Sequence, residues 1–222
     1  LAQIKIADQL YEINIPRYYA IFMNQNSAAP LKEKAVREAL ARATDRPTII
    51  TRALGGRGTA MTGPLYPGVE GYDVGSTSTP TFSIEEASKL LDANGWTTGD
   101  DGIRIKKISQ NRLRLAFELV VPDIEFLVES AKIIESDWEK IGVAVTLVVT
   151  NPADVSADAV KSRNYQLLLF GNVMRENPDI FSFWHSSERF YPGLNLSLYE
   201  NKTVDRLLET VRQENDSATR IA

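Results

Sequence analysis

The sequence of 222 residues contains no cysteine and a single histidine, His185. Without cysteine the chain has no disulfide, no thiolate metal site and no cysteine nucleophile. A Ser/His/Asp triad or a histidine-rich metal site would have to be built around the one imidazole that is present. We therefore expect neither a metal site nor a cofactor.

Long apolar runs and an excess of basic residues are also missing. No stretch approaches the roughly 20 apolar residues that a membrane-spanning helix needs. The chain has 25 Lys and Arg against 29 Asp and Glu, which gives a net charge of −4. This balance provides no basic surface for nucleic acid or for an anionic membrane. With 43% hydrophobic and 24% charged residues, the composition is that of a soluble globular protein long enough to bury a core.

The first half of the chain alternates predicted strands with predicted helices. One strand is apolar throughout, at 18–23, and this predicts burial on both of its faces. The stretch 55–82 is rich in glycine and proline and has no periodicity, which is typical of a functional loop or of a segment packed across a neighbour. The predicted elements of this half are strands at 10–15 and 18–23 and helices at 31–43, 47–54 and 83–94.

The second half contains the clearest pattern, a strand-helix-strand-helix-strand order from residue 113 to residue 170. This order predicts parallel neighbouring strands in an α/β fold. Ligands of open α/β sheets bind at the carboxyl ends of such strands, so the pattern points to the residues that follow Phe170. The predicted elements are strands at 113–121, 143–149 and 165–170 and helices at 123–141, 152–163, 177–184 and 204–211. The predicted core comprises Phe22, Leu40, Leu91, Phe117, Leu127, Ile134, Trp138, Val145 and Leu168.

Seven short motifs follow one another in a fixed order over about residues 10 to 215. They are Phe22-Met23-Asn24, Lys34 to Leu40 followed by Ala43 to Arg46, Gly58 to Pro67, Glu86 to Leu91 followed by Gly95-Trp96, Asp137 to Val145, Pro178 to Phe181, and Asn195 to Leu208. Their order resembles that of the extracellular solute-binding proteins of peptide and nickel ABC importers. Each motif alone is weak, but seven in register are specific.

The resemblance implies a periplasmic-binding-protein type II-like lobe, with a mixed sheet flanked by helices. Full members of that family have two lobes, and this sequence is similar to their second lobe alone, so residues 1–222 are expected to form a single lobe. The implied function is non-enzymatic: a receptor that delivers a peptide or similar small solute to a membrane-embedded ABC permease. Such a receptor is expected to be a monomer and extracytoplasmic, either periplasmic or lipid-anchored. The resemblance leaves the ligand open among peptides, sugars, opines and metal chelates.

The segment after the last apolar strand is the predicted ligand-binding loop. The strand order and the resemblance agree on this position. The predicted binding residues are Gly171, Asn172, Val173, Met174, Arg175 and Glu176, with Asn24 and Asn195 added as polar residues at element ends. For these two asparagines the sequence leaves two alternatives open, because each side chain either faces the cleft or holds backbone. His185 is interpreted as a surface or structural residue rather than a ligand.

Two other classes of function stay open at this point. One is a hydrolase that uses a carboxylate pair such as Glu176 and Asp179, although no G-x-S-x-G nucleophile motif occurs. The other is a stand-alone interaction domain that has no partner lobe. Sequence upstream and downstream of this segment in the parent reading frame would distinguish them.

The residue at Met174 generates a first testable prediction. Family members that hold a peptide's free ammonium carry an Asp at the position that we align with Met174, and a thioether cannot pair with an ammonium. The ligand is therefore anchored by another acid such as Glu176, or it has no free ammonium. Substituting Met174→Asp in the full receptor should leave unchanged, or should strengthen, the affinity for free-amino peptides measured by calorimetry. A large loss of affinity in a folded variant would contradict this interpretation of the loop.

Overall fold

The computed structural model describes residues 17–61, 63, 65, 72, 80–173, 180–214 and 216, and the strand predicted at 10–15 lies outside them. The elements in chain order are β1 (Arg17–Met23), the 3-10 helix η1 (Ala29–Lys32), α1 (Lys34–Arg42), α2 (Arg46–Ala53), α3 (Ile84–Ala93), β2 (Thr97–Thr98), β3 (Arg104–Ile108), β4 (Asn111–Arg114), β5 (Ala116–Pro122), α4 (Glu125–Glu139), β6 (Ala144–Thr150), α5 (Pro152–Asp154), the π-helix η2 (Val155–Val160), β7 (Leu167–Val173), α6 (Phe181–Trp184), the 3-10 helix η3 (Ser186–Arg189) and α7 (Lys202–Gln213).

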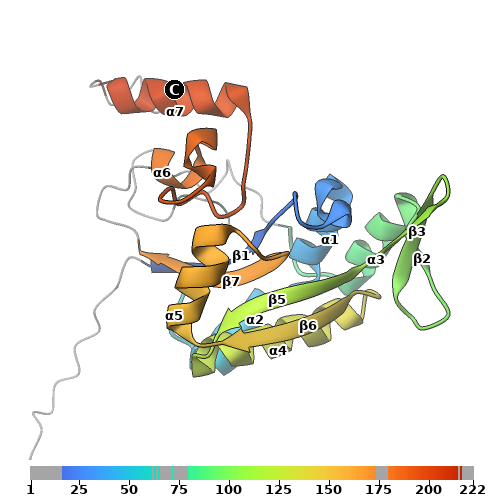
Figure 1. Cartoon of the computed structure of the whole chain (residues 1–222). Coiled ribbons are helices and arrows are strands. Elements are labelled where there is room, and N and C mark those ends of the chain that lie inside the picture. The colour runs from blue at the N-terminus through green and yellow to red at the C-terminus, as the bar shows by residue number, and fades with distance from the viewer. Residues whose placement is uncertain are drawn as a thin grey trace, which may run out of the picture.

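The central layer is a four-stranded mixed sheet in the order β1-β7-β5-β6. The strands β5, β6 and β7 are parallel, as their alternation with helices predicts, and β1 pairs with β7 in the antiparallel direction. Helices α2 and α4 lie beneath the sheet in Figure 1, whereas α5 lies on its other side. The predicted mixed sheet flanked by helices is confirmed. None of the described helices is long and apolar enough to cross a membrane.

The single strand predicted at 113–121 is wrong in one respect, because it is two strands that belong to two sheets. Leu115 separates them: its N–H donates to the Arg104 carbonyl at 2.9 Å, while its carbonyl accepts from the N–H of Ala144, also at 2.9 Å. Every second side chain nevertheless faces the core across the break, with Leu113 half-buried and Leu115 and Phe117 buried. The smaller sheet, β2-β3-β4, was not predicted, because its polar strands carry too few apolar residues to alternate.

Two further predictions need correction. The helix predicted at 31–43 is divided into η1 and α1 by the extended backbone of Glu33. The Arg37 guanidinium donates to the carbonyls of Leu31 at 2.7 Å and Lys32 at 3.0 Å, so a side chain occupies acceptors that a continuous helix would use. Strand β1 is not buried on both faces, because it lies at the edge of the sheet and Tyr19 is 38% exposed.

The core lies mainly between the sheet and the helices α1, α3 and α4. All of the predicted core residues are buried except Val145, which is half-buried because β6 is an edge strand. Trp138 is fully buried, and its indole N–H donates to the Leu40 carbonyl at 3.1 Å and to the Thr44 hydroxyl at 3.0 Å. One side chain of α4 therefore both fills the core and holds the end of α1.

The segment after β7 is held to the other face of the sheet by two polar side chains. The guanidinium of Arg163 donates to the carbonyls of Arg189 at 2.8 Å and Gly193 at 2.6 Å. The hydroxyl of Tyr165 donates to the Leu196 carbonyl, and burial raises the pKa of this tyrosine to about 12. In Figure 1 the last helix, α7, lies above α6 and away from the sheet.

Trp138→Phe should lower the free energy of unfolding by roughly 2–3 kcal/mol, because the variant loses the indole hydrogen bonds and leaves a small cavity. Urea denaturation followed by circular dichroism would measure this change. Ile108→Ala provides the control: its side chain is 44% exposed, so the stability should change by less than about 0.5 kcal/mol. Equal effects of the two substitutions would contradict the role assigned to Trp138.

Candidate ligand-binding site at the carboxyl edge of the sheet

The central strands β5 and β7 separate at their carboxyl ends, and the cause is Pro122. Their pairing covers only Leu119↔Leu167 and Val120↔Leu168. The next bond of this parallel ladder would run from the N–H of residue 122 to the Leu169 carbonyl, and proline has no N–H. On its other side β5 stays paired with β6 through Pro122↔Thr150. The sheet is therefore open between β5 and β7, and we call this opening the fork.

The backbone of β7 offers hydrogen-bonding groups to the fork. The Gln166 carbonyl accepts from the N–H of Asn24 at 2.9 Å, so Gln166 and every second residue after it face β1. The alternate residues Leu169, Gly171 and Val173 consequently direct their N–H and C=O groups toward the β5 side. Beyond Leu168 no described strand pairs with that side.

The fork also lies where the connections of the sheet change direction. The chain passes from β5 through α4 to β6 on one side, then returns through α5 and η2 to β7 on the other side of β5. Helix α4 covers one face of the sheet, while η2 packs against the other. A crevice at such a switch point, outside the carboxyl ends of the strands, is where open α/β sheets bind ligands.

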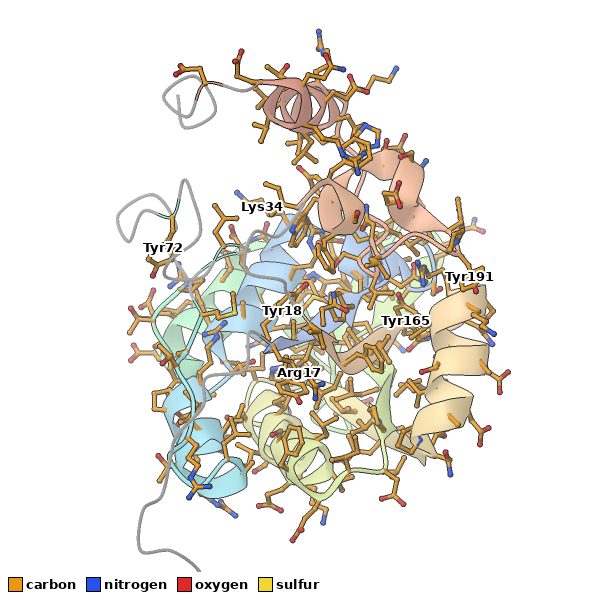
Figure 2. The ribbon with its side chains drawn as sticks, turned by 90° about the vertical axis from the view of Figure 1, so that its left-hand side faces the viewer. Arg17, Tyr18, Lys34, Tyr72, Tyr165 and Tyr191 are labelled. Carbon is orange, nitrogen blue, oxygen red and sulfur yellow. The ribbon has the colours of Figure 1, made fainter. Side chains whose placement is uncertain are left out.

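Two tyrosines of β1 contact β7 beside the fork, one on each face of the sheet. The Asn172 amide donates to the Tyr18 hydroxyl at 3.0 Å, and burial raises the pKa of this tyrosine. The Tyr19 ring covers Gly171 and meets the Phe126 ring edge-on, with 5.0 Å between the ring centroids. Figure 2 looks onto this edge of the molecule, with Arg17 and Tyr18 near its centre. Beside the fork, β7 is thus covered by an aromatic ring on the α4 face, and it carries an amide–phenol pair on the η2 face.

The predicted binding residues fall into three groups. Gly171, Asn172 and Val173 lie together on β7 at the fork. Met174, Arg175 and Glu176 lie outside the described residues, as does Asp179 of the hydrolase alternative.

The third group is the two asparagines, which lie away from the fork. Asn24 is at the opposite end of β1, where its amide donates to the Arg163 carbonyl at 3.0 Å. Asn195 is fully buried, donates to the Tyr199 carbonyl at 2.9 Å and accepts from the Tyr199 N–H at 3.0 Å. Both side chains hold backbone, which matches the structural alternative, and the ligand role predicted for them stays untested.

Sequence reasoning missed the tyrosines and the role of Pro122. The strand predicted at 113–121 stops just before Pro122, but the effect of this proline depends on which neighbouring strand its nitrogen faces. His185 is buried, with Nδ1 2.8 Å from the Ser187 hydroxyl and Nε2 3.4 Å from a Glu209 oxygen. Within the described ranges no group of His, Asp and Glu side chains is arranged to hold a metal ion.

Comparison with known proteins decides the family. Residues 1–190 match the model of the bacterial extracellular solute-binding proteins, family 5, middle region. The chain belongs to this family. Its members are extracytoplasmic binding proteins rather than enzymes.

Individual relatives agree with this family assignment. The oligopeptide-binding protein AppA of Bacillus subtilis is 28% identical over 190 residues, which are 83% of this chain and 34% of that protein. The structure of AppA with a nonapeptide superposes with a TM-score of 0.82 at 24% identity, and it covers 93% of this chain and 41% of AppA.

Two more relatives have different stated ligands. The probable D,D-dipeptide-binding periplasmic protein DdpA of Escherichia coli is 26% identical over 227 residues, 98% of this chain and 40% of that protein. NikZ of Campylobacter jejuni, solved in complex with Ni(L-His), superposes with a TM-score of 0.79 at 24% identity, over 93% of this chain and 41% of NikZ. The family 5 chain described here thus spans a little over a third of the length of its curated relatives.

The contact between Tyr19 and Gly171 yields a prediction for this family 5 chain. A Cβ atom at Gly171 would lie 2.5 Å from Cε1 of Tyr19, so the ring must move. Gly171→Ala should therefore lower the free energy of unfolding by roughly 1–3 kcal/mol in thermal or urea denaturation. In a Tyr19→Ala background the same substitution should have little effect. Equal destabilisation in both backgrounds would show that the ring is not the obstacle.

Proposed function

We propose that this chain is the second, ligand-binding lobe of a two-lobed family 5 receptor that delivers peptides or similar small solutes to an ABC importer. The fork supports this proposal best, because it places backbone groups that pair with no described strand at the switch point of a sheet whose fold resembles that of AppA. In this proposal residues 1–222 form one lobe, Gly171, Asn172 and Val173 contact the ligand, and the loop of Met174, Arg175 and Glu176 continues that surface. No catalytic residue and no cofactor is involved.

The backbone of the fork favours an extended ligand that carries its own amide groups. Gly171 and Val173 present donors and acceptors at strand spacing, and an extended peptide has matching groups at the same spacing. The aromatic ring of Tyr19 provides apolar contact beside these groups, and the Tyr18–Asn172 pair provides polar contact. Peptides therefore suit this lobe better than ligands without a repeating backbone.

The partners follow from the receptor function. In the full-length protein a first lobe closes over the fork, and the closed receptor docks as a monomer on a membrane-embedded permease outside the cytoplasm. A lipid anchor or a periplasmic location would each keep the receptor near that permease. A hydrolase is the weaker proposal, because relatives with this fold are named for binding rather than for catalysis.

The half-site proposal predicts a large difference in affinity between this chain and the full-length protein. Native mass spectrometry of the purified full-length protein would first identify a bound solute. Titration of that solute should then give an affinity for residues 1–222 at least about 100-fold weaker, because most of a buried ligand's surface is covered only when both lobes contact it. Comparable affinities of residues 1–222 and the full-length protein would contradict the proposal that this chain forms only half of the binding site.

Val173 provides a sharper test of the fork itself. Its N–H faces the fork and its side chain is 56% exposed, so Val173→Pro removes one donor without removing a β1–β7 bond. In the full-length protein this variant should bind the identified solute roughly tenfold more weakly, which is the usual range for one lost hydrogen bond to a ligand. Val173→Ala keeps the N–H and serves as the matched control. Equal affinities of the two variants would exclude the Val173 N–H as a ligand contact.

A further inference from the structure

The strand β6 forms the free edge of the sheet farthest from β1, and its hydrogen-bonding pattern can be derived. The N–H of Ala144 donates to the Leu115 carbonyl at 2.9 Å, and the Thr150 carbonyl accepts from the N–H of Asp123 at 2.8 Å. Both ends of β6 therefore use their even-numbered residues to bond β5. In the described part of the chain β5 is the only strand that pairs with β6. The N–H and C=O groups of Val145, Leu147 and Val149 consequently face outward along the edge.

This edge lacks the features that protect exposed edge strands. Proteins usually prevent strand addition with a charged side chain, a proline, a bulge or a very short edge strand. The sequence of β6 is AVTLVVT, with no charge and no proline, and its register with β5 is continuous from Ala144 to Thr150. Val149 is 44% exposed on it. Such an uncharged, β-branched edge is suited to accept another strand.

A cleft beside β6 indicates the side chains that such a strand would carry. The cleft, of about 280 Å³, lies between β6 and α4 and is lined by Ile103, Lys132, Glu135, Ser136, Glu139 and Val143 to Val145. Glu135 and Glu139 form no ion pair within the described residues, and Lys132 is the one cation among the lining residues. In an antiparallel pair, a residue that hydrogen-bonds to Val145 or Leu147 has its side chain on the same face as these residues, the α4 face. That side chain would enter the cleft beside the two carboxylates.

We propose that β6 is a docking site for an extended segment of another protein, which adds as a fifth, antiparallel strand and places basic side chains against Glu135 and Glu139. A second copy of this chain is a poorer occupant, because pairing β6 with itself would bring the acidic α4 helices of both copies together. The proposal does not depend on the proposed solute-binding function, because β6 lies beyond β5 from β7, on the far side of the fork. A single added strand buries less surface than a stable complex needs, so the contact is weak and transient.

The test uses synthetic seven-residue peptides in which lysine alternates with threonine, acetylated and amidated at their ends. They are titrated into the ¹⁵N-labelled 222-residue chain while its amide resonances are recorded. Saturable shifts are expected at the amides of Val145, Leu147 and Val149. A peptide with glutamate in place of lysine should bind roughly five- to tenfold more weakly, as expected for the loss of two partly exposed ion pairs. Shifts elsewhere, or none, would overturn the proposal.

N-methylated peptides separate strand addition from simple charge attraction. Methylation at the lysine nitrogens removes the N–H groups that face β6 and should abolish binding. Methylation at the threonine nitrogens removes only outward N–H groups and should retain most of it. Equal binding of both peptides would show that the backbone is not recognised.

Two protein variants complete the design. Val149→Pro removes one outward N–H at an edge position where proline is tolerated, so binding should fall at least about threefold with the melting temperature nearly unchanged. Val149→Ala, which keeps the N–H, should bind like the parent chain. Glu139→Gln should weaken the lysine peptide but not the glutamate peptide. Concentration-dependent dimers in analytical ultracentrifugation that Val149→Pro abolishes would instead identify a second copy as the occupant and refute the proposal.

Discussion

The peptide nitrogen of Pro122 carries no hydrogen, and the arrangement of the carboxyl edge depends on this one missing donor. An ordinary residue at this position would extend the ladder between β5 and β7 by one bond, to the Leu169 carbonyl. With proline the ladder ends, while β5 stays paired with β6 through the same residue. The central strands can then separate at the point where the connecting helices change faces. The opening therefore lies in the middle of the sheet instead of at its rim.

Buried polar side chains hold the segments around this sheet in place. Arg104 is almost fully buried, and it donates to the carbonyls of Ile141 at 2.8 Å and Trp96 at 2.7 Å, so it attaches the small sheet to the core. Arg163 has the same function for the segment after β7, and desolvation lowers its pKa. The buried amides of Asn24 and Asn195 likewise hold backbone, by donating to the carbonyls of Arg163 and Tyr199. Because an unpaired buried polar group costs about 1–3 kcal/mol, such residues fix the path of irregular backbone.

The two edge strands of the main sheet, β1 and β6, differ in the charge and type of their side chains. Strand β1 begins with a charged residue, Arg17, and carries the two tyrosines that contact β7. Strand β6 is uncharged and lies beside a cleft with two carboxylates. The fork lies between these edges, so the two proposed binding places are separate on one sheet.

The sequence by itself determined the elements whose residues face one environment along their whole length. Apolar residues recur at 3–4 spacing in α4 and at alternate positions in β5, and both patterns can be read from the sequence, because a continuous apolar face has to be covered wherever the element lies. The order of elements was also sufficient to predict parallel strands, and the motifs were sufficient to identify the family. The helix caps at Asn151 and Ser83 are local in the same way, since they depend only on residues a few positions away.

Only the tertiary structure decided which neighbour each backbone group faces. Pro122 opens the fork because its nitrogen faces β7 and not β6, and the sequence around it contains no information on that direction. Tyr19 covers Gly171 although about 150 positions separate them, and the Asn172 amide contacts the Tyr18 hydroxyl across a sequence separation of 154. Strand β1 is half-exposed, in spite of an apolar sequence, because it lies at the edge of the sheet. Such properties arise from pairing between distant segments, and the local spacing of residue types cannot encode them.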